Sequence, residues 1–108
     1  MELPLTIATH DVTLTEPVER LIHEKAAKLE RFHSRIVGCR VTVDRPDGHH
    51  RNGGQYKVRI ELSIPGNDIV VNHKGGDNLP MAVRDAFDAA QRQLDEREEL
   101  RRGERRAS

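Results

Sequence analysis

The stretch EKAAKLERFHSRIVGCRV, residues 24–41, marks the point at which a helical pattern gives way to a strand pattern. Apolar residues before this point recur every three or four positions, which is the spacing of one buried helix face. They are Val18, Leu21, Ile22, Leu29 and Phe32. From Cys39 onward, apolar and polar residues alternate, as they do along a half-buried strand. The stretch therefore predicts a helix over 16–33 followed by a strand, with Phe32 and Cys39 packed at the corner between them.

Residues outside this corner extend the same two patterns in both directions. Period-two alternation occurs in residues 3–10, 39–44, 55–64 and 69–74, and PGND at 65–68 predicts a tight turn between the last two of these strands. A second helix is indicated by apolar positions at helical spacing. They are Leu79, Ala82, Val83, Ala86, Phe87, Ala90 and Leu94.

Capping residues predict where both helices begin. Thr15 is the expected N-cap of the first helix, with Pro17 in its first turn. Asp77 or Asn78 is expected to cap the second helix, with Pro80 in its first turn. The resulting order is β-α-β-β-β-α.

Every predicted strand has one apolar face and one polar face, so the sheet should be covered on one side only. The fold class expected is α+β, a two-layer β-α-β-β-β-α sandwich. A four-stranded mixed sheet carries both helices on one face, with the first two strands parallel if they are neighbours.

Composition limits the classes of protein that this chain can belong to. Its 108 residues are enough for one domain, and 18 basic residues balance 18 acidic ones. Phe32, Phe87 and Tyr56 are its only aromatic residues, so base stacking on an aromatic platform is not the expected mode of nucleic-acid binding. No segment approaches the ~20 apolar residues of a membrane span. The lone Cys39 cannot form an internal disulfide, which fits a cytoplasmic protein without a signal peptide.

Cationic residues gather on one edge of the first predicted helix. Lys25, Lys28 and Arg31 are spaced i, i+3, i+6, and Arg20 prolongs this edge toward the N-terminus. Two interpretations remain open on the residues alone. The edge can be an ordinary solvated face balanced by nearby glutamates, or it can neutralise the phosphates of a nucleic acid.

The second predicted helix offers matching cations. Arg84 and Arg92 lie two turns apart, with Asp88 between them as a possible ion-pair partner of both. If the helices pack side by side, their two basic edges can border a common groove.

No catalytic or metal-binding constellation stands out. His49 and His50 are adjacent in a glycine-rich loop, which is not the spacing of a metal site. Cys39 is expected to point into the core, and the serines and glycine pairs match no nucleophile elbow, P-loop or dinucleotide fingerprint. We therefore predict a protein that is not an enzyme and that has no cofactor, metal or small-molecule substrate.

The last segment is almost entirely charged. We expect residues 1–94 to form the domain and residues 95–108 to form a charged helix extension and tail that frays after Gly103, since this segment has little to pack against.

Four of these segments together resemble one family, the ribosome hibernation-promoting factors, also called the ribosome-associated inhibitor or sigma-54 modulation family. They are VERLIHEKAAKLERF (18–32), CRVTVD (39–44), YKVRIELSIPGNDIVVN (56–72) and NLPMAVRDAFDAAQRQL (78–94). The resemblance covers residues 3–94 in order and spacing, in the short form of the family with a polar, histidine-containing loop after the second strand.

The resemblance implies a fold similar to double-stranded-RNA-binding domains and a partner, the small ribosomal subunit. Members of the family bind ribosomal RNA in the decoding channel, block messenger and transfer RNA, and protect idle ribosomes under stress. Lys25, Lys28 and Arg31 match the basic positions of helix one, and Arg84 and Arg92 match those of helix two. Further expected RNA contacts are Arg20, Arg35 and Lys74. A chain ending at residue 108 is expected to carry no dedicated dimerisation domain.

The alternative from a different class is a protein-interaction adaptor. It would use the open polar face of the sheet, whose residues are Arg40, Thr42, Lys57, Arg59 and Glu61. An enzyme is a third and more remote alternative, which would require a concave pocket with converging titratable groups.

Overall fold

A computed structural model of the chain describes residues 4–45 and 55–107, with side chains up to Gly103. Its elements are β1 (Leu5–His10), α1 (Glu16–Phe32), β2 (Gly38–Asp44), β3 (Lys57–Ser63), β4 (Ile69–Lys74) and α2 (Leu79–Ala107). The predicted order β-α-β-β-β-α is confirmed. The loop with His49 and His50 lies outside the described residues.

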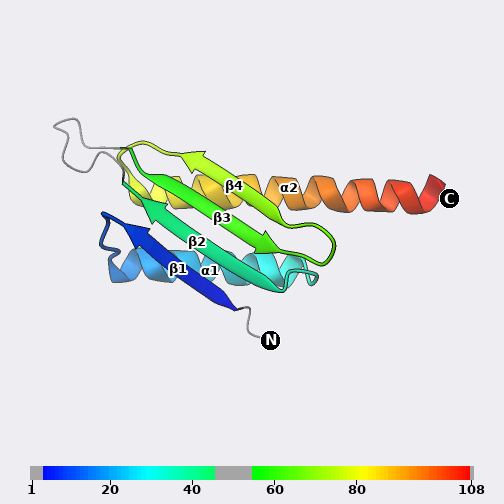
Figure 1. Cartoon of the computed structure of the whole chain (residues 1–108), viewed down its shortest axis with the longest axis horizontal. Helices are drawn as coiled ribbons and strands as arrows, with labels where there is room; N and C mark the ends of the chain where they lie inside the picture. Colours follow the sequence, from blue (N-terminus) through cyan, green and yellow to red (C-terminus); the bar gives the residue numbers. More distant parts are fainter. Residues whose placement is uncertain (1–3, 46–54, 108) are drawn as a thin grey trace.

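The four strands form one mixed sheet in the order β1-β2-β3-β4 (Figure 1). β1 pairs with β2 in parallel, with Leu5 opposite Cys39, and α1 makes the connection between them. β2, β3 and β4 follow as antiparallel neighbours, with Val41 opposite Ile60 and Ile60 opposite Val71. The expected parallel pairing of the first two strands is thus confirmed.

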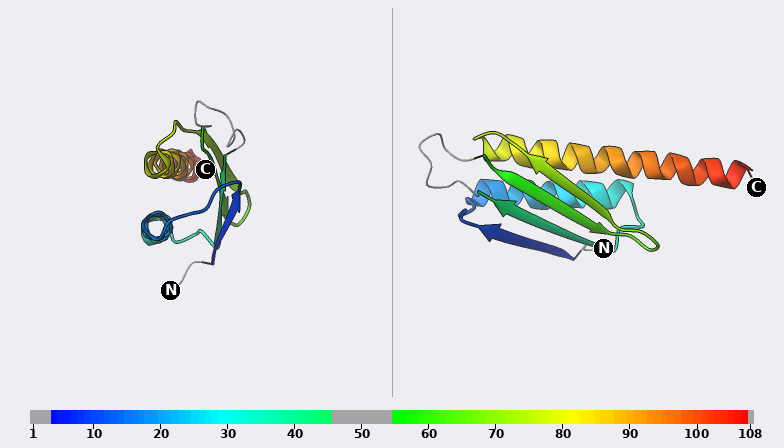
Figure 2. Two further views of the ribbon diagram at one scale, coloured as in Figure 1. Left: turned by 90° about the vertical axis from the view of Figure 1, so that its left-hand side faces the viewer. Right: turned by 45° about the horizontal axis from the view of Figure 1, so that its top comes forward.

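Both helices lie on the same face of the sheet, and among the described residues no helix covers the other face (Figure 2). The core between the two layers is aliphatic, with Phe87 as its only buried aromatic residue among those described. The inward residues of β2, β3 and β4 alternate with outward ones, as the period-two pattern predicts. By contrast, β1 has no fully buried residue, and Leu5, Ile7 and Ala8 are only half-buried.

The predicted caps and turn are present. The Thr15 hydroxyl oxygen accepts a hydrogen bond from the backbone N–H of Val18 at 3.4 Å. The Asn78 side-chain oxygen accepts one from the backbone N–H of Met81 at 3.0 Å, so Asn78 rather than Asp77 caps α2. Between β3 and β4, Gly66 takes a positive φ of 96°, a conformation that glycine adopts without a steric penalty.

The predicted packing of Phe32 is wrong. Its side chain is 62% exposed, whereas the neighbouring His33 is only 8% exposed. Positions 22, 26, 29 and 33 form the stripe that faces the sheet and α2, so the last buried position of this stripe belongs to His33. His33 is also the C-cap of α1, where its backbone N–H donates to the Leu29 carbonyl oxygen at 2.8 Å.

The second helix is longer than the pattern of apolar residues predicts. α2 has 29 residues and continues to Ala107, and the expected fraying after Gly103 stays a prediction. Its last turns project beyond the sheet (Figure 1), and the molecule measures 56 × 27 × 19 Å. The extension has a contact that the sequence did not reveal, because the Arg97 guanidinium donates to the carbonyl oxygen of Asn67 in the β3–β4 turn. The division of the chain at residue 94 stays a prediction.

Within residues 4–45 and 55–107, neither helix combines the length and the apolar content that crossing a membrane requires.

Candidate nucleic-acid interface

A groove runs between the two helices on the side away from the sheet, and its middle part is lined by lysines of α1. Lys25 and Lys28 face Asp88 and Gln91 of α2, with the exposed Phe32 beside them. Lys25 is half-buried and Lys28 is exposed, so both can present their ammonium groups to a ligand lying in the groove while their stems pack against apolar atoms.

The groove continues toward the N-terminal ends of the helices. There Arg20 of α1 and Arg84 of α2 line one hollow, together with Glu24 and two prolines, Pro17 and Pro80. The structure therefore brings four of the predicted RNA-binding residues, from both helices, to two consecutive hollows between these helices. They are Arg20, Lys25, Lys28 and Arg84.

The other four predicted residues lie elsewhere. Arg31 and Arg92 are exposed on their helices but line neither of these two hollows. Lys74 ends β4, paired in register with Lys57. Arg35 follows α1 and lines a separate pocket at the other end of the domain.

By its spacing on α2, Asp88 is a possible ion-pair partner of Arg84 and Arg92. Among the described residues it forms an ion pair with neither, and it points instead into the part of the groove that holds Lys25 and Lys28. Its carboxylate therefore lowers the positive potential of the groove at the place where the lysines raise it.

The C-terminal part of the groove has the opposite charge. Asp95, Glu98 and Glu99 line it, with Arg102 as the only described cation there. Phosphate groups are attracted to the first part of the groove and repelled from this last part, so charge along the groove limits the candidate interface to the part that precedes Asp95 on α2.

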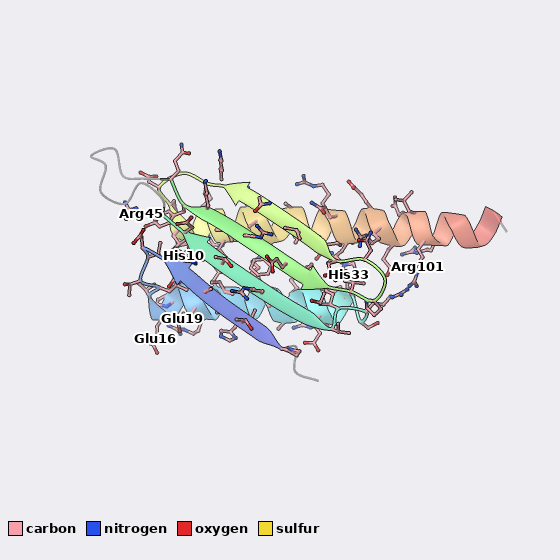
Figure 3. The ribbon with its side chains drawn as sticks, in the orientation of Figure 1. His10, Glu16, Glu19, His33, Arg45 and Arg101 are labelled. Atoms are coloured by element: carbon pink, nitrogen blue, oxygen red, sulfur yellow. The ribbon has the colours of Figure 1, made fainter. Side chains whose placement is uncertain are left out.

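His33 joins the two helices at the boundary between these parts, a role that sequence reasoning missed. Its Nε2 lies 3.0 Å from the Gln91 amide nitrogen and 3.4 Å from the Asp95 carboxylate, and the Gln91 amide also donates to Asp95 at 3.2 Å. The spacing of residues could have predicted this contact. His33 continues the i, i+4, i+7 stripe of α1, and Gln91 and Asp95 lie one turn apart on α2. Figure 3 places His33 and Arg101 at the opposite end of the helices from Glu16 and Glu19.

The uncovered face of the sheet is the surface of the adaptor alternative. Its residues Arg40, Thr42, Lys57, Arg59 and Glu61 are exposed or half-buried, as expected. Arg59 and Glu61 already pair with each other at 2.8 Å, which reduces the charge that this face can offer to a partner.

Few of the described side chains could act as a nucleophile or bind a metal ion. Burial raises the pKa of the Cys39 thiol to about 11, so it stays protonated and is a packing residue. Among the described residues, no three His, Cys, Asp or Glu side chains lie close enough to hold a metal ion. The enzyme alternative requires a concave pocket. The structure has such a pocket beside Arg35, so the shape of the surface does not exclude an enzyme.

Comparison with known proteins decides the family. The family described as sigma 54 modulation protein / S30EA ribosomal protein matches residues 5–102. The chain belongs to this family. The resemblance found in the sequence is thereby confirmed, and the match extends eight residues beyond the predicted domain end at residue 94.

Individual relatives agree with this assignment. The ribosome hibernation promotion factor of Deinococcus radiodurans is 30% identical over 88 residues, which cover 82% of this chain and 45% of that protein. The chain thus spans about half the length of the curated relative that it matches. Membership of this family also supports a binding protein over an enzyme.

Two solved structures share the fold. A ribosomal subunit interface protein from Coxiella burnetii superposes with a TM-score of 0.76 at 12% identity, covering 89% of this chain and 98% of that one. The N-terminal domain of Thermus thermophilus Protein Y gives a TM-score of 0.68 at 17% identity, covering 87% and 96%. At these identities the likeness establishes the fold alone.

Proposed function

We propose that this chain is a ribosome-associated translation inhibitor, a hibernation factor that binds small-subunit ribosomal RNA in the decoding channel and sterically blocks messenger and transfer RNA. The observation that carries the proposal is the position of four cations from two helices in consecutive hollows between these helices: Arg20 and Arg84 line one hollow, and Lys25 and Lys28 line the next. Family membership supplies the ribosome as partner, and such a role implies a cytoplasmic protein.

The mechanism is phosphate neutralisation without a reaction. Each lysine or arginine that contacts a phosphate releases condensed counterions, so affinity depends steeply on salt although the net charge of the chain is zero. The paired helices offer phosphate contacts on two sides of one groove, which fixes the orientation of the protein on the RNA. Once bound, the domain occludes the channel by its volume alone.

The test is co-sedimentation with purified small subunits across a salt series. A Lys25→Ala, Lys28→Ala, Arg31→Ala variant is expected to keep its circular-dichroism spectrum and to bind much more weakly at every salt concentration. Its plot of log affinity against log salt should become shallower by roughly 2 units, because about 0.7–0.9 unit is lost with each phosphate contact.

A matched control comes from the other face of the sheet. An Arg40→Ala, Lys57→Ala, Arg59→Ala variant also removes three positive charges and is expected to bind almost as well as the parent. If this variant loses binding and the helix variant keeps it, the adaptor alternative on the sheet face replaces the proposal. Binding that survives nuclease treatment and responds weakly to salt would lead to the same conclusion.

A further inference from the structure

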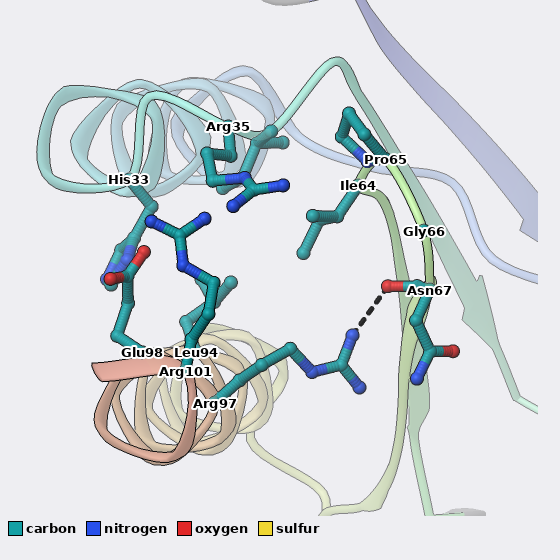
Figure 4. Close-up of a pocket in the computed structure, with 11 residues that line it drawn as sticks. His33, Arg35, Ile64, Pro65, Gly66, Asn67, Leu94, Arg97, Glu98 and Arg101 are labelled. Carbon is teal, nitrogen blue, oxygen red and sulfur yellow. Dashed lines mark hydrogen bonds between the residues drawn. The ribbon is translucent and has the colours of Figure 1, made fainter. Parts of the chain in front are cut away.

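A second concave site lies at the far end of the domain and shares no residue with the basic part of the groove. It is a pocket of about 210 Å³ between the segment after α1, the β3–β4 turn and the extension of α2 (Figure 4). Its apolar wall consists of Ile36, Ile64 and Leu94, of which Ile36 and Leu94 are buried core residues.

Three arginines from two segments border this apolar wall. Arg35 follows α1, and Arg97 and Arg101 lie one turn apart on α2. Figure 4 shows the guanidinium groups of Arg35 and Arg101 on the same side of the pocket, whereas Arg97 turns toward the Asn67 carbonyl oxygen. Among the described residues, Glu98 is the only acidic residue of the lining, so three arginines face one carboxylate there.

Arg101, which lines this pocket, is incompletely hydrogen-bonded. Its Nε is buried and has no hydrogen-bond partner among the described residues. Buried polar groups in native proteins are almost always hydrogen-bonded, and guanidinium groups remain charged at every physiological pH. An anionic oxygen between Arg35 and Arg101 would accept from the terminal N–H groups of both guanidiniums and offset the repulsion between the two cations.

The size and lining of the pocket define the ligand further. An apolar cavity of about 150 Å³ is enough to hold benzene, so the pocket can accept one compact apolar group beside an anionic group. We propose that it binds a free small organic anion, a phosphate monoester or carboxylate with one such group. The apolar part would contact Ile36, Ile64 and Leu94, and the anionic oxygens would accept from Arg35 and Arg101. This site is independent of the proposed ribosomal role.

The proposal is tested by NMR titration of the ¹⁵N-labelled 108-residue chain with phenyl phosphate at low salt. Saturable shifts are expected at the amides of Ile36, Gly66 and Asn67, with a Kd in the millimolar range or below, as suits a ligand of this size. Inorganic phosphate should bind more weakly because it lacks the apolar group. Phenol, which lacks the charge, should not shift these amides.

Arg101→Ala should weaken phenyl phosphate binding by about tenfold or more, the usual loss when a charge-assisted hydrogen-bonding partner is removed. Arg102→Ala is the matched control, since it removes the same charge from the next residue of α2, which does not line this pocket. Equal weakening in both variants, or no saturable shift at the pocket, would overturn the proposal. So would a short RNA that shifts these amides when phenyl phosphate does not, since the arginines would then belong to the RNA interface.

Discussion

Position 75 requires glycine because a side chain there would have no space, not because of its backbone conformation. A Cβ at this position would lie 2.5 Å from the Cβ of Ala82, in the first turns of α2. Since this neighbour is rigid, Gly75→Ala must displace α2 from the β4 end of the sheet. We expect the free energy of unfolding to fall by about 1–3 kcal/mol in urea denaturation. Gly76→Ala is the control, because open space surrounds that position; an equal loss in both variants would contradict this explanation.

The buried thiol predicts a pH dependence of stability at alkaline pH. Burial raises the pKa of Cys39 from 9.0 to about 11, so between these values the unfolded chain loses the proton first. Stability from this group is therefore fully present below the unfolded pKa and falls as pH rises toward the folded one, by roughly 2–3 kcal/mol. Denaturation of the parent and of Cys39→Ala should show this decline in the parent only. Parallel pH profiles would exclude Cys39 as its cause.

Individual residues were the least predictable part of the chain. Phe32 and His33 occupy adjacent positions at the edge of the α1 stripe. Hydrophobicity alone predicts that the phenylalanine, not the histidine, is buried. The chain turns away at His33, so no element covers Phe32, and partners on α2 satisfy the imidazole. Such an outcome depends on where α2 lies, which local periodicity does not encode.

At the scale of single elements, capping stabilises the start of α2. The Asn78 side chain accepts from the backbone N–H of Met81 at 3.0 Å, and no acidic residue lies in the first turn to favour the helix dipole. Asn78→Ala should lower the free energy of unfolding by about 1 kcal/mol, whereas Asn78→Asp should preserve it because aspartate caps equally well. The comparison is made by thermal or urea denaturation. Equal stability of all three proteins would show that the cap is dispensable.

The elements themselves were largely predictable, except for what the extension of α2 packs against. Strand faces, caps and the order of elements follow from periods of two and 3.6 residues and from Thr15, Asn78 and Gly66. The contacts of this extension did not follow, because the apolar stripe stops at Leu94 while the same face continues through Arg97 and Arg101. The aliphatic stems of arginine pack like apolar side chains, but a search for apolar positions at helical spacing treats arginine as charged.

At the scale of the whole molecule, the placement of charges matters more for the proposed RNA binding than the net charge does. The chain is neutral, yet the groove between the helices is basic in its first part and acidic in its last part. Sequence could place the cations on their helices. It could not show that Asp88 shares the groove with Lys25 and Lys28, because this depends on how the two helices face each other.

Removing this carboxylate should strengthen the proposed RNA binding. Asp88→Asn raises the positive potential beside Lys25 and Lys28, and we expect a few-fold higher affinity for small subunits at low salt that fades as salt increases. Asp85→Asn is the matched control. It removes the same charge from α2, but Asp85 faces His73 of β4 at 3.8 Å rather than the groove. A similar gain in both variants would indicate a general charge effect, not a local one.

The incomplete burial of β1 affects the order in which the strands of the domain detach. β2, β3 and β4 hold one another through consecutive antiparallel pairs, whereas β1 lies at an edge and joins the sheet only after a helical crossover. Because none of its residues is fully buried, its detachment is the least costly opening of the sheet. Native-state hydrogen exchange should therefore release the β1 amides before those of β3, and the freed edge of β2 would be the first place where a foreign strand could add.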